Sequence, residues 1–116
     1  MVITNNQLRA IWNNDNSIAL TNTKADINKN TWNFVVMSVT PTNVNLYVND
    51  KKYTFNGSYA PVNFSSPVII GYDTYSPGGF IGLIDNVRVY TSTLTSMEVK
   101  QLYAEGLKSH QDLAVK

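Results

Sequence analysis

Cysteine is absent from the sequence, and histidine occurs once, as His110. Without cysteine the chain has no disulfides, no cysteine-based zinc sites and no thiol chemistry. One histidine cannot form a histidine-based metal cluster, and a catalytic triad needs a buried, oriented imidazole. We expect His110 to be a solvated residue of a polar tail, which leaves no candidate for Ser-His-Asp catalysis.

Charged residues are also scarce. They make up 15% of the chain, against about 25% in typical globular proteins, and the formal net charge is +1. Nucleic-acid binding needs clustered Lys and Arg, yet the only adjacent pair, Lys51 and Lys52, falls in an expected hairpin turn. We therefore expect no nucleic-acid partner. A surface rich in Asn, Thr and Ser suits a protein that works outside the cell or on an envelope.

Long apolar runs are missing as well. No stretch of about 18 apolar residues occurs, so we expect no membrane insertion. Residues 1–5 lack the charged start and the apolar stretch of a signal peptide. At this point the chain fits either the cytoplasm or the soluble part of a larger exported protein.

The sequence contains many short segments of alternating hydrophobicity, separated by clusters of Asn, Pro and Gly. This spacing is typical of antiparallel all-β domains. The expected strands cover residues 7–12, 17–23, 32–40, 43–49, 52–55 and 67–72. In the fourth of these, Val44, Leu46 and Val48 alternate with asparagines, which predicts a half-buried strand with a wet outer face.

Residues 79–90 (GFIGLIDNVRVY) have the pattern of a long strand. Phe80, Gly82 and Ile84 share one face, but Val87 and Val89 have the opposite parity. A change of parity within a strand predicts a β-bulge, here at Asp85-Asn86.

A single helix is predicted after this strand. Thr95 has the position of an N-cap, and Glu98 completes a capping box three residues later. Val99, Leu102 and Tyr103 form an apolar stripe, and Gly106 is placed to end the helix. We expect a β-sandwich domain over residues 1–107 and a polar tail over residues 108–116.

Three motifs resemble one known family. They are residues 32–36 (WNFVV), residues 44–51 (VNLYVNDK), and residues 82–90 (GLIDNVRVY) followed by 94–99 (LTSMEV). In order and spacing they resemble the laminin-G-like group of the concanavalin-A-like lectin and glucanase jelly rolls, which is related to pentraxins. The resemblance covers residues 7–107 and implies an antiparallel β-sandwich with one short C-terminal helix.

The chain departs from that family in length. Domains of the family are usually longer and begin with strands that pair beside the last strand, and these opening strands are not evident here. Either this is a short version of the domain, or another chain completes the sheet. Since an uncovered sheet edge promotes association, a homo-oligomer is one expected partner.

Glycoside hydrolysis is not expected. A retaining glucanase needs two carboxylates about 5 to 5.5 Å apart across the sugar bond. The only glutamates are Glu98 and Glu105, both on the predicted helix, and no strand carries alternating carboxylates. We predict that the protein is not an enzyme.

Calcium is the one cofactor that the resemblance suggests. Asp73 lies where pentraxin-like relatives place acidic ligands, although Thr74 and Tyr75 beside it are not carboxylates. A turn-forming aspartate is the ordinary explanation of Asp73. Asp85 matches an aspartate that is nearly constant in the family, and there we expect a structural role at the bulge.

Carbohydrate binding would use exposed aromatic faces together with Asn and Asp side chains. Tyr59, Tyr72 and Tyr75 lie in or beside expected loops, and Asn14 lies in an oxygen-rich turn. These are the candidate ligand-binding residues, while packing at the rim is the ordinary explanation for each tyrosine. We expect Trp12 and Trp32 to lie in the core.

The leading hypothesis is a non-catalytic module that binds carbohydrate or a protein surface. It would form part of a larger extracellular or envelope protein, of prokaryotic origin, with a role in adhesion. The alternative is a structural or assembly domain that has no small ligand and completes its sheet by self-association.

Overall fold

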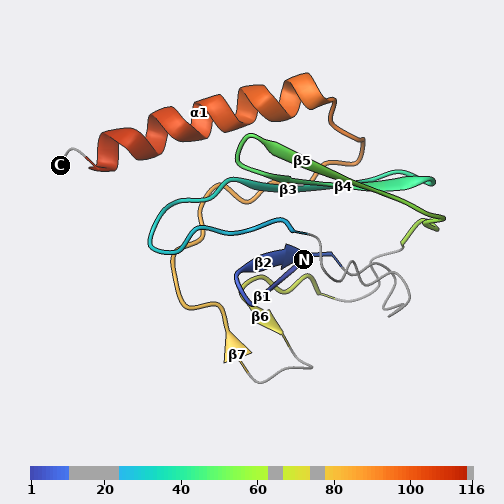
Figure 1. Ribbon diagram of the computed structural model, residues 1–116, viewed down its shortest axis with the longest axis horizontal. Helices are drawn as coiled ribbons and strands as arrows, with labels where there is room; N and C mark the ends of the chain where they lie inside the picture. The colour runs from blue at the N-terminus through green and yellow to red at the C-terminus, as the bar shows by residue number, and fades with distance from the viewer. Residues whose placement is uncertain (11–23, 63–66, 74–77, 115–116) are drawn as a thin grey trace.

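The structure is a computed structural model that describes residues 1–10, 24–62, 67–73 and 78–114 (Figure 1). Its strands are β1 (Val2–Thr4), β2 (Gln7–Arg9), β3 (Val35–Val39), β4 (Asn43–Val48), β5 (Lys51–Asn56), β6 (Tyr72–Asp73) and β7 (Gly78–Gly79). One helix, α1, spans Ser96–Ala114. Strands β3, β4 and β5 form an antiparallel sheet, and β1–β2 and β6–β7 form two separate pairs.

The three-stranded sheet follows directly from the alternation of its middle strand. Val44, Leu46 and Val48 of β4 are buried, as predicted. Leu46 pairs with Met37 of β3 on one side and with Tyr53 of β5 on the other. The predicted strands at 43–49 and 52–55 and the turn between them are thus confirmed within a residue or two.

A hairpin at the start of the chain was not predicted. Strands β1 and β2 are joined by Asn5 and Asn6, which have φ values of 52° and 62°. Two successive residues at positive φ are the mark of a type I′ turn, the turn that matches the twist of paired strands. The first strand expected from the sequence begins at residue 7, so β1 was not predicted.

The molecule has three layers. Figure 1 shows α1 on one side of the β3-β4-β5 sheet and the β1–β2 hairpin on the other. The core lies between the sheet and the hairpin, with Leu8, Ala10, Ala25, Val44, Leu46, Val48 and Tyr59 as its buried members. The backbone of Leu8 donates to Ala25 O at 2.8 Å, which holds the hairpin against the segment before β3.

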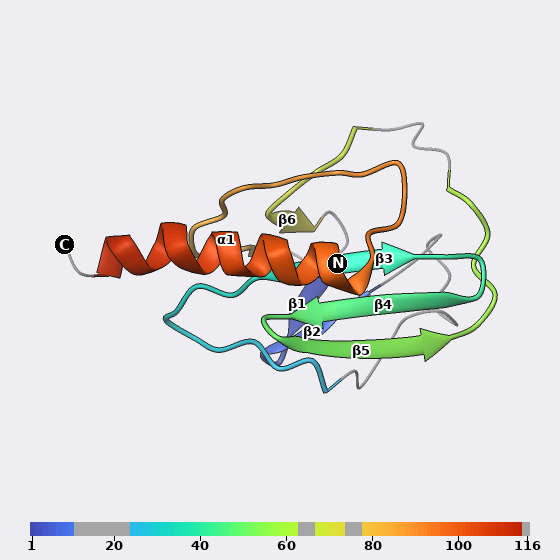
Figure 2. The same cartoon turned by 90° about the horizontal axis from the view of Figure 1, so that it is seen from above.

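Helix α1 packs on the opposite face of the sheet and runs along it (Figure 2). Val99 is 2% exposed, and Tyr103 contacts Phe34 with ring centroids 5.6 Å apart. At the start of the helix, the Tyr47 and Ser96 hydroxyl oxygens are 3.2 Å apart. The predicted apolar stripe therefore does face the sheet.

The predicted end of the helix is wrong. Helix α1 continues past Gly106 to Ala114, and Gly106 does not adopt the positive φ of a helix-ending glycine. Gly106 and His110 are half-buried at seven and eleven residues beyond Val99, so the buried stripe extends over two further turns. Packing overrides the local stop signal, and residues 108–114 are helical rather than a polar tail.

The predicted long strand at 79–90 is also not observed. Only Gly78–Gly79 pair, with Tyr72–Asp73, and residues 80–90 are outside any strand. The backbone does turn at the predicted bulge, where Asn86 has a φ of 53°. The likewise predicted strand at 67–72 is reduced to Tyr72 and its neighbour in β6.

The described part of the chain does not show a complete two-sheet sandwich. It is mostly β, with one three-stranded antiparallel sheet and a C-terminal helix. Within the same residues, no helix is long and apolar enough to cross a membrane. The predicted strand at 17–23 lies outside the described residues.

Candidate functional site

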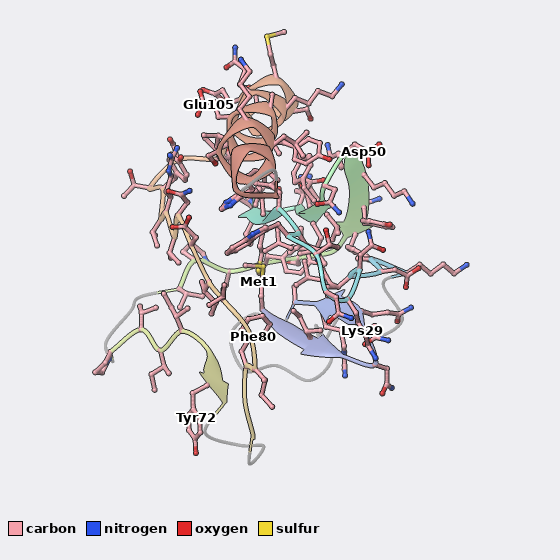
Figure 3. All side chains as sticks on the ribbon, turned by 90° about the vertical axis from the view of Figure 1, so that its left-hand side faces the viewer. Met1, Lys29, Asp50, Tyr72, Phe80 and Glu105 are labelled. Atoms are coloured by element: carbon pink, nitrogen blue, oxygen red, sulfur yellow. The ribbon has the colours of Figure 1, made fainter. Side chains whose placement is uncertain are left out.

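A polar hollow lies at the turn between β4 and β5. It has a volume of about 270 Å³ and is lined by Asp26, Asn28, Val48, Asn49, Asp50 and Lys51. Figure 3 shows Asp50 at the end of the β4–β5 hairpin and Lys29 on the neighbouring loop, on the same side of the molecule. We call this site the polar hollow.

The loop that forms one wall is held by a single asparagine. Asn33 Oδ1 accepts from the backbone N of Asn28 at 3.1 Å, and Asn33 Nδ2 donates to Asn28 O at 2.7 Å and to Thr31 O at 3.0 Å. Both ends of the Asn33 amide are thus used to close a tight loop. The wall therefore has a defined shape before any ligand arrives.

The opposite wall is tied to the same network. Asn49 Oδ1 accepts from Phe34 N at 2.9 Å, and Asn49 Nδ2 donates to Asn33 Oδ1 at 3.3 Å. The backbone N of Asn49 also donates to Phe34 O at 2.8 Å. Asn49 has a φ of 55°, which forms the hairpin turn. Its side-chain bonds to Phe34 and Asn33 hold this turn against the loop.

Three charged groups border the polar hollow. Gln7 Nε2 donates to Asp26 Oδ1 at 3.1 Å, which orients that carboxylate. In the described part of the chain, the side chains of Asp50 and Lys51 have no hydrogen-bond or ion-pair partner. Their polar groups are therefore free to bind a ligand that offers hydroxyl or other hydrogen-bonding groups.

The side chains that line the polar hollow offer hydrogen-bonding groups. Across the described ranges, no group of three or more His, Cys, Asp or Glu side chains lies close enough to hold a metal ion. Asp73, the predicted calcium ligand, is the last residue of β6 and pairs through its backbone with Gly78 of β7. Calcium binding at Asp73 stays a prediction.

Of the predicted ligand-binding residues, the structure describes Tyr59 and Tyr72, and neither lines the polar hollow. Tyr59 is 6% exposed, and its hydroxyl donates to Phe55 O at 3.4 Å. This burial leaves no free ring face for a sugar, so Tyr59 belongs to the core. Tyr72 is 58% exposed and lies far from the polar hollow (Figure 3), and Asn14 and Tyr75 lie outside the described residues.

The residues predicted to be structural have the geometry expected of them. Asp85 Oδ1 accepts from the backbone N of Asn86 at 2.7 Å, which stabilises the turn at Asn86. Glu98 Oε2 accepts from Thr95 N and from Thr95 Oγ1, both at 2.7 Å, and Thr95 Oγ1 accepts from Glu98 N at 3.2 Å. These bonds form the predicted capping box, and the backbone and hydroxyl donors of Thr95 lower the pKa of Glu98.

His110 and Trp32 contradict the predictions made for them. The His110 side chain is only 16% exposed, and its ring stacks on Trp32 with centroids 4.2 Å apart and an interplanar angle of 22°. His110 Nε2 lies 3.8 Å from Asp85 Oδ2. His110 is therefore a packing residue of α1 rather than part of a solvated tail. Trp32 is 40% exposed and stacks on the His110 ring instead of lying in the core.

The residues of the polar hollow were not predicted from the sequence. They combine the loop at 26–33 with a hairpin turn some twenty residues later, and only the fold joins them. The one local signal is the density of Asn and Asp in both segments. It predicts the turn at Asn49-Asp50, whereas residues 26–31 carry no sequence prediction and Asn33 falls in the expected strand at 32–40.

Comparison with known proteins gives one family and one solved structure. The laminin G model described as "Concanavalin A-like lectin/glucanases superfamily" matches residues 1–100. No curated protein matches the chain. The crystal structure of an S-layer domain-containing protein (residues 221–444) from Clostridium thermocellum is similar with a TM-score of 0.61 and 22% sequence identity. The match covers 70% of this chain and 43% of the solved chain.

Proposed function

Because the chain belongs to the concanavalin A-like lectin/glucanase superfamily, we propose that it is a non-catalytic module that binds carbohydrate at the polar hollow. The observation that carries the proposal is the free pair Asp50 and Lys51 above walls that Asn33 and Asn49 hold in place. Sugars present many hydroxyl groups, and carboxylates, amides and ammonium groups bind them through oriented hydrogen bonds.

Preorganisation supports this assignment. Binding is weakened when loops and side chains must be ordered on contact with the ligand. Here the two walls are already joined through Asn33 and Asn49, and Gln7 orients Asp26. A shallow polar site with fixed walls suits a carbohydrate better than it suits an apolar ligand.

A setting outside the cell is part of the same proposal. The similar solved structure is described as S-layer domain-containing, and this chain has a polar, weakly charged composition. We propose that the module works in a larger extracellular or envelope protein.

The placement of the two glutamates supports a non-catalytic role. Both glutamates lie on α1, where Glu98 belongs to the capping box and Glu105 is exposed. General acid catalysis needs a carboxyl group with a raised pKa beside the bond that breaks. The pKa of Glu98 is lowered instead, by the Thr95 donors.

A glycan array followed by titration calorimetry tests the proposal. We expect Asp50→Asn and Asp26→Asn each to weaken binding of the selected glycan about ten-fold, because each removes a charged acceptor. Glu105→Gln is the matched control, since it neutralises an exposed carboxylate on α1 and should leave the affinity unchanged.

Two results would overturn the proposal. One is an array without binding to any glycan. The other is glycan binding that Asp26→Asn and Asp50→Asn leave intact but that Tyr72→Ala abolishes, which would place the site at β6 instead.

A further inference from the structure

An exposed apolar ribbon lies apart from the polar hollow. Its large side chains are each 45% exposed or more, and Ile81 is fully exposed. They are Val68, Ile69, Ile70, Tyr72, Phe80, Ile81, Leu83, Ile84, Val87, Val89 and Tyr90. The two stretches of the ribbon meet where Phe80 N donates to Gly71 O at 2.7 Å. Figure 2 shows the second stretch on the opposite side of α1 from β4 and β5.

The backbone of residues 81–90 makes almost no hydrogen bonds within the described part of the chain. From residue 81 to residue 90, which the structure describes throughout, the one backbone hydrogen bond is from Asn86 N to the Asp85 side chain. Unpaired amides beside β-branched and aromatic side chains are a template for pairing with another strand. Residues 81–90 have the sequence pattern of a strand, but no strand of the described residues pairs with them.

The exposed area is large enough for a stable interface. Large side chains have areas of about 150 to 250 Å². At the observed exposures the seven large apolar side chains of residues 80–90 offer roughly 700 to 1,100 Å² of surface, and a standard interface buries about 800 Å² on each partner. Monomeric proteins rarely leave an apolar patch of this size uncovered.

The charges of the ribbon match a second copy of itself. Residues 80–90 contain two charged side chains of opposite sign, Asp85 and Arg88. In the described part of the chain Arg88 has no ion-pair partner, and the Asp85 side chain is 54% exposed. A two-fold axis beside Asn86 would place Asp85 of each copy opposite Arg88 of the other.

This register also pairs the apolar residues. Ile84 falls opposite Val89, and Leu83 falls opposite Tyr90, on both sides of the axis. Pairing centred on Asp85 would instead place two aspartates opposite one another, which is unfavourable. Because this axis lies between Asn86 and Val87, each strand must change its side-chain parity there, and Asn86, with its φ of 53°, is the irregular residue that allows the change.

We propose that residues 80–90 pair antiparallel with residues 80–90 of a second copy, and that the chain forms a closed two-fold dimer through this ribbon. The dimer buries the apolar side chains and satisfies the free backbone groups. It leaves the polar hollow open, so dimerisation and ligand binding are independent.

Sedimentation and light scattering over a concentration series test the proposal. The expected result is a mass that rises from 13.0 kDa and stops at twice that value. Asp85→Arg and Arg88→Asp should each weaken the dimer about ten-fold, because each places like charges opposite one another at two symmetric positions. The double variant D85R/R88D should restore the affinity of the unmodified chain.

Glu105→Arg and Lys108→Asp are matched controls, since they make the same charge changes on exposed positions of α1. Circular dichroism of each variant verifies that it folds. Three results would overturn the proposal: a single-chain mass at every concentration, a mass that rises without a limit, or a double variant that stays as weak as the single ones. The restored double variant identifies a second copy as the occupant, because no other partner carries the compensating charges.

Discussion

Among the residues that the structure describes, five asparagines adopt a positive φ, namely Asn5, Asn6, Asn30, Asn49 and Asn86. Asparagine tolerates this conformation better than other residues with a side chain, and its amide can bond nearby backbone groups. In this chain it therefore makes the tight turns that glycine makes in many β proteins. At Asn49 the same residue also joins the turn to the loop at 28–33, which a glycine could not do.

The capping box is the clearest residue-scale test of the sequence argument. Thr95→Ala should lower the free energy of unfolding by about 1 kcal/mol, because the first turn of α1 loses its side-chain acceptor. Urea denaturation followed by circular dichroism measures this change. A matched Ser109→Ala substitution, near the other end of α1, should have a smaller effect. Equal effects of the two substitutions would contradict the role of Thr95.

Glu98 adds a pH dependence with a defined sign. Its pKa in the folded protein is lowered from 4.5 because Thr95 donates to it through backbone and side chain. A lowered folded pKa gives stabilisation that is present above pH 4.5 and is lost as the pH falls through the folded pKa. In Glu98→Gln this part of the pH dependence should be missing. Denaturation curves of the two proteins from neutral pH to pH 3 should therefore differ in slope, and parallel curves would contradict the capping geometry.

At the scale of the elements, local contacts make the start of α1 and the β4–β5 hairpin predictable, although the equally local β1–β2 hairpin was missed. The start of α1 was predicted because the capping box lies within four residues, and the β4–β5 hairpin because alternation and the Asn49-Asp50 turn agree. The end of α1 was not predicted from the sequence, because it depends on the stacking of His110 on Trp32, a residue far away along the chain. Residues 79–90 have the pattern of a strand, but a strand also needs a neighbour, which the pattern does not contain.

Gly106 tests the extended helix. An added Cβ at Gly106 would meet no heavy atom within 4 Å, and the residue has a helical backbone. Gly106→Ala should therefore raise the free energy of unfolding by up to about 1 kcal/mol, since alanine restricts the unfolded chain and favours the helix. Thermal denaturation measures the gain. A loss of stability would mean that Gly106 ends the helix after all.

For the whole molecule, the largest buried cluster is the layer of apolar side chains between the β3-β4-β5 sheet and the β1–β2 hairpin. Leu46 is fully buried at the centre of β4, within the core that joins the sheet to the β1–β2 hairpin. Leu46→Ala should cost about 2 to 5 kcal/mol, a large part of the 5 to 15 kcal/mol typical of a domain. Leu107→Ala, at a residue that is 40% exposed, is the matched control and should cost much less. Similar losses at both positions would contradict the layered core.

The polar hollow shows what sequence patterns miss at this scale. Asp26 and Asp50 belong to segments whose local chemistry predicts turns, and both segments do turn. That they share one site follows only from the pairing of β4 with β5 and from the Asn33–Asn49 bond. Among the aromatic candidates, Tyr59 is drawn into the core by packing that its loop-like surroundings do not reveal, while Tyr72 stays a prediction.

The position of α1 has a consequence for how the protein is made. The helix is the last element of the described chain, yet Val99 and Tyr103 cover the face of the sheet that carries Phe34 and Tyr47. During synthesis the sheet and the β1–β2 hairpin can associate on the ribosome before α1 has emerged. One face of the nascent sheet therefore stays uncovered until the helix is released, and during that interval a chaperone or a second nascent chain has access to it.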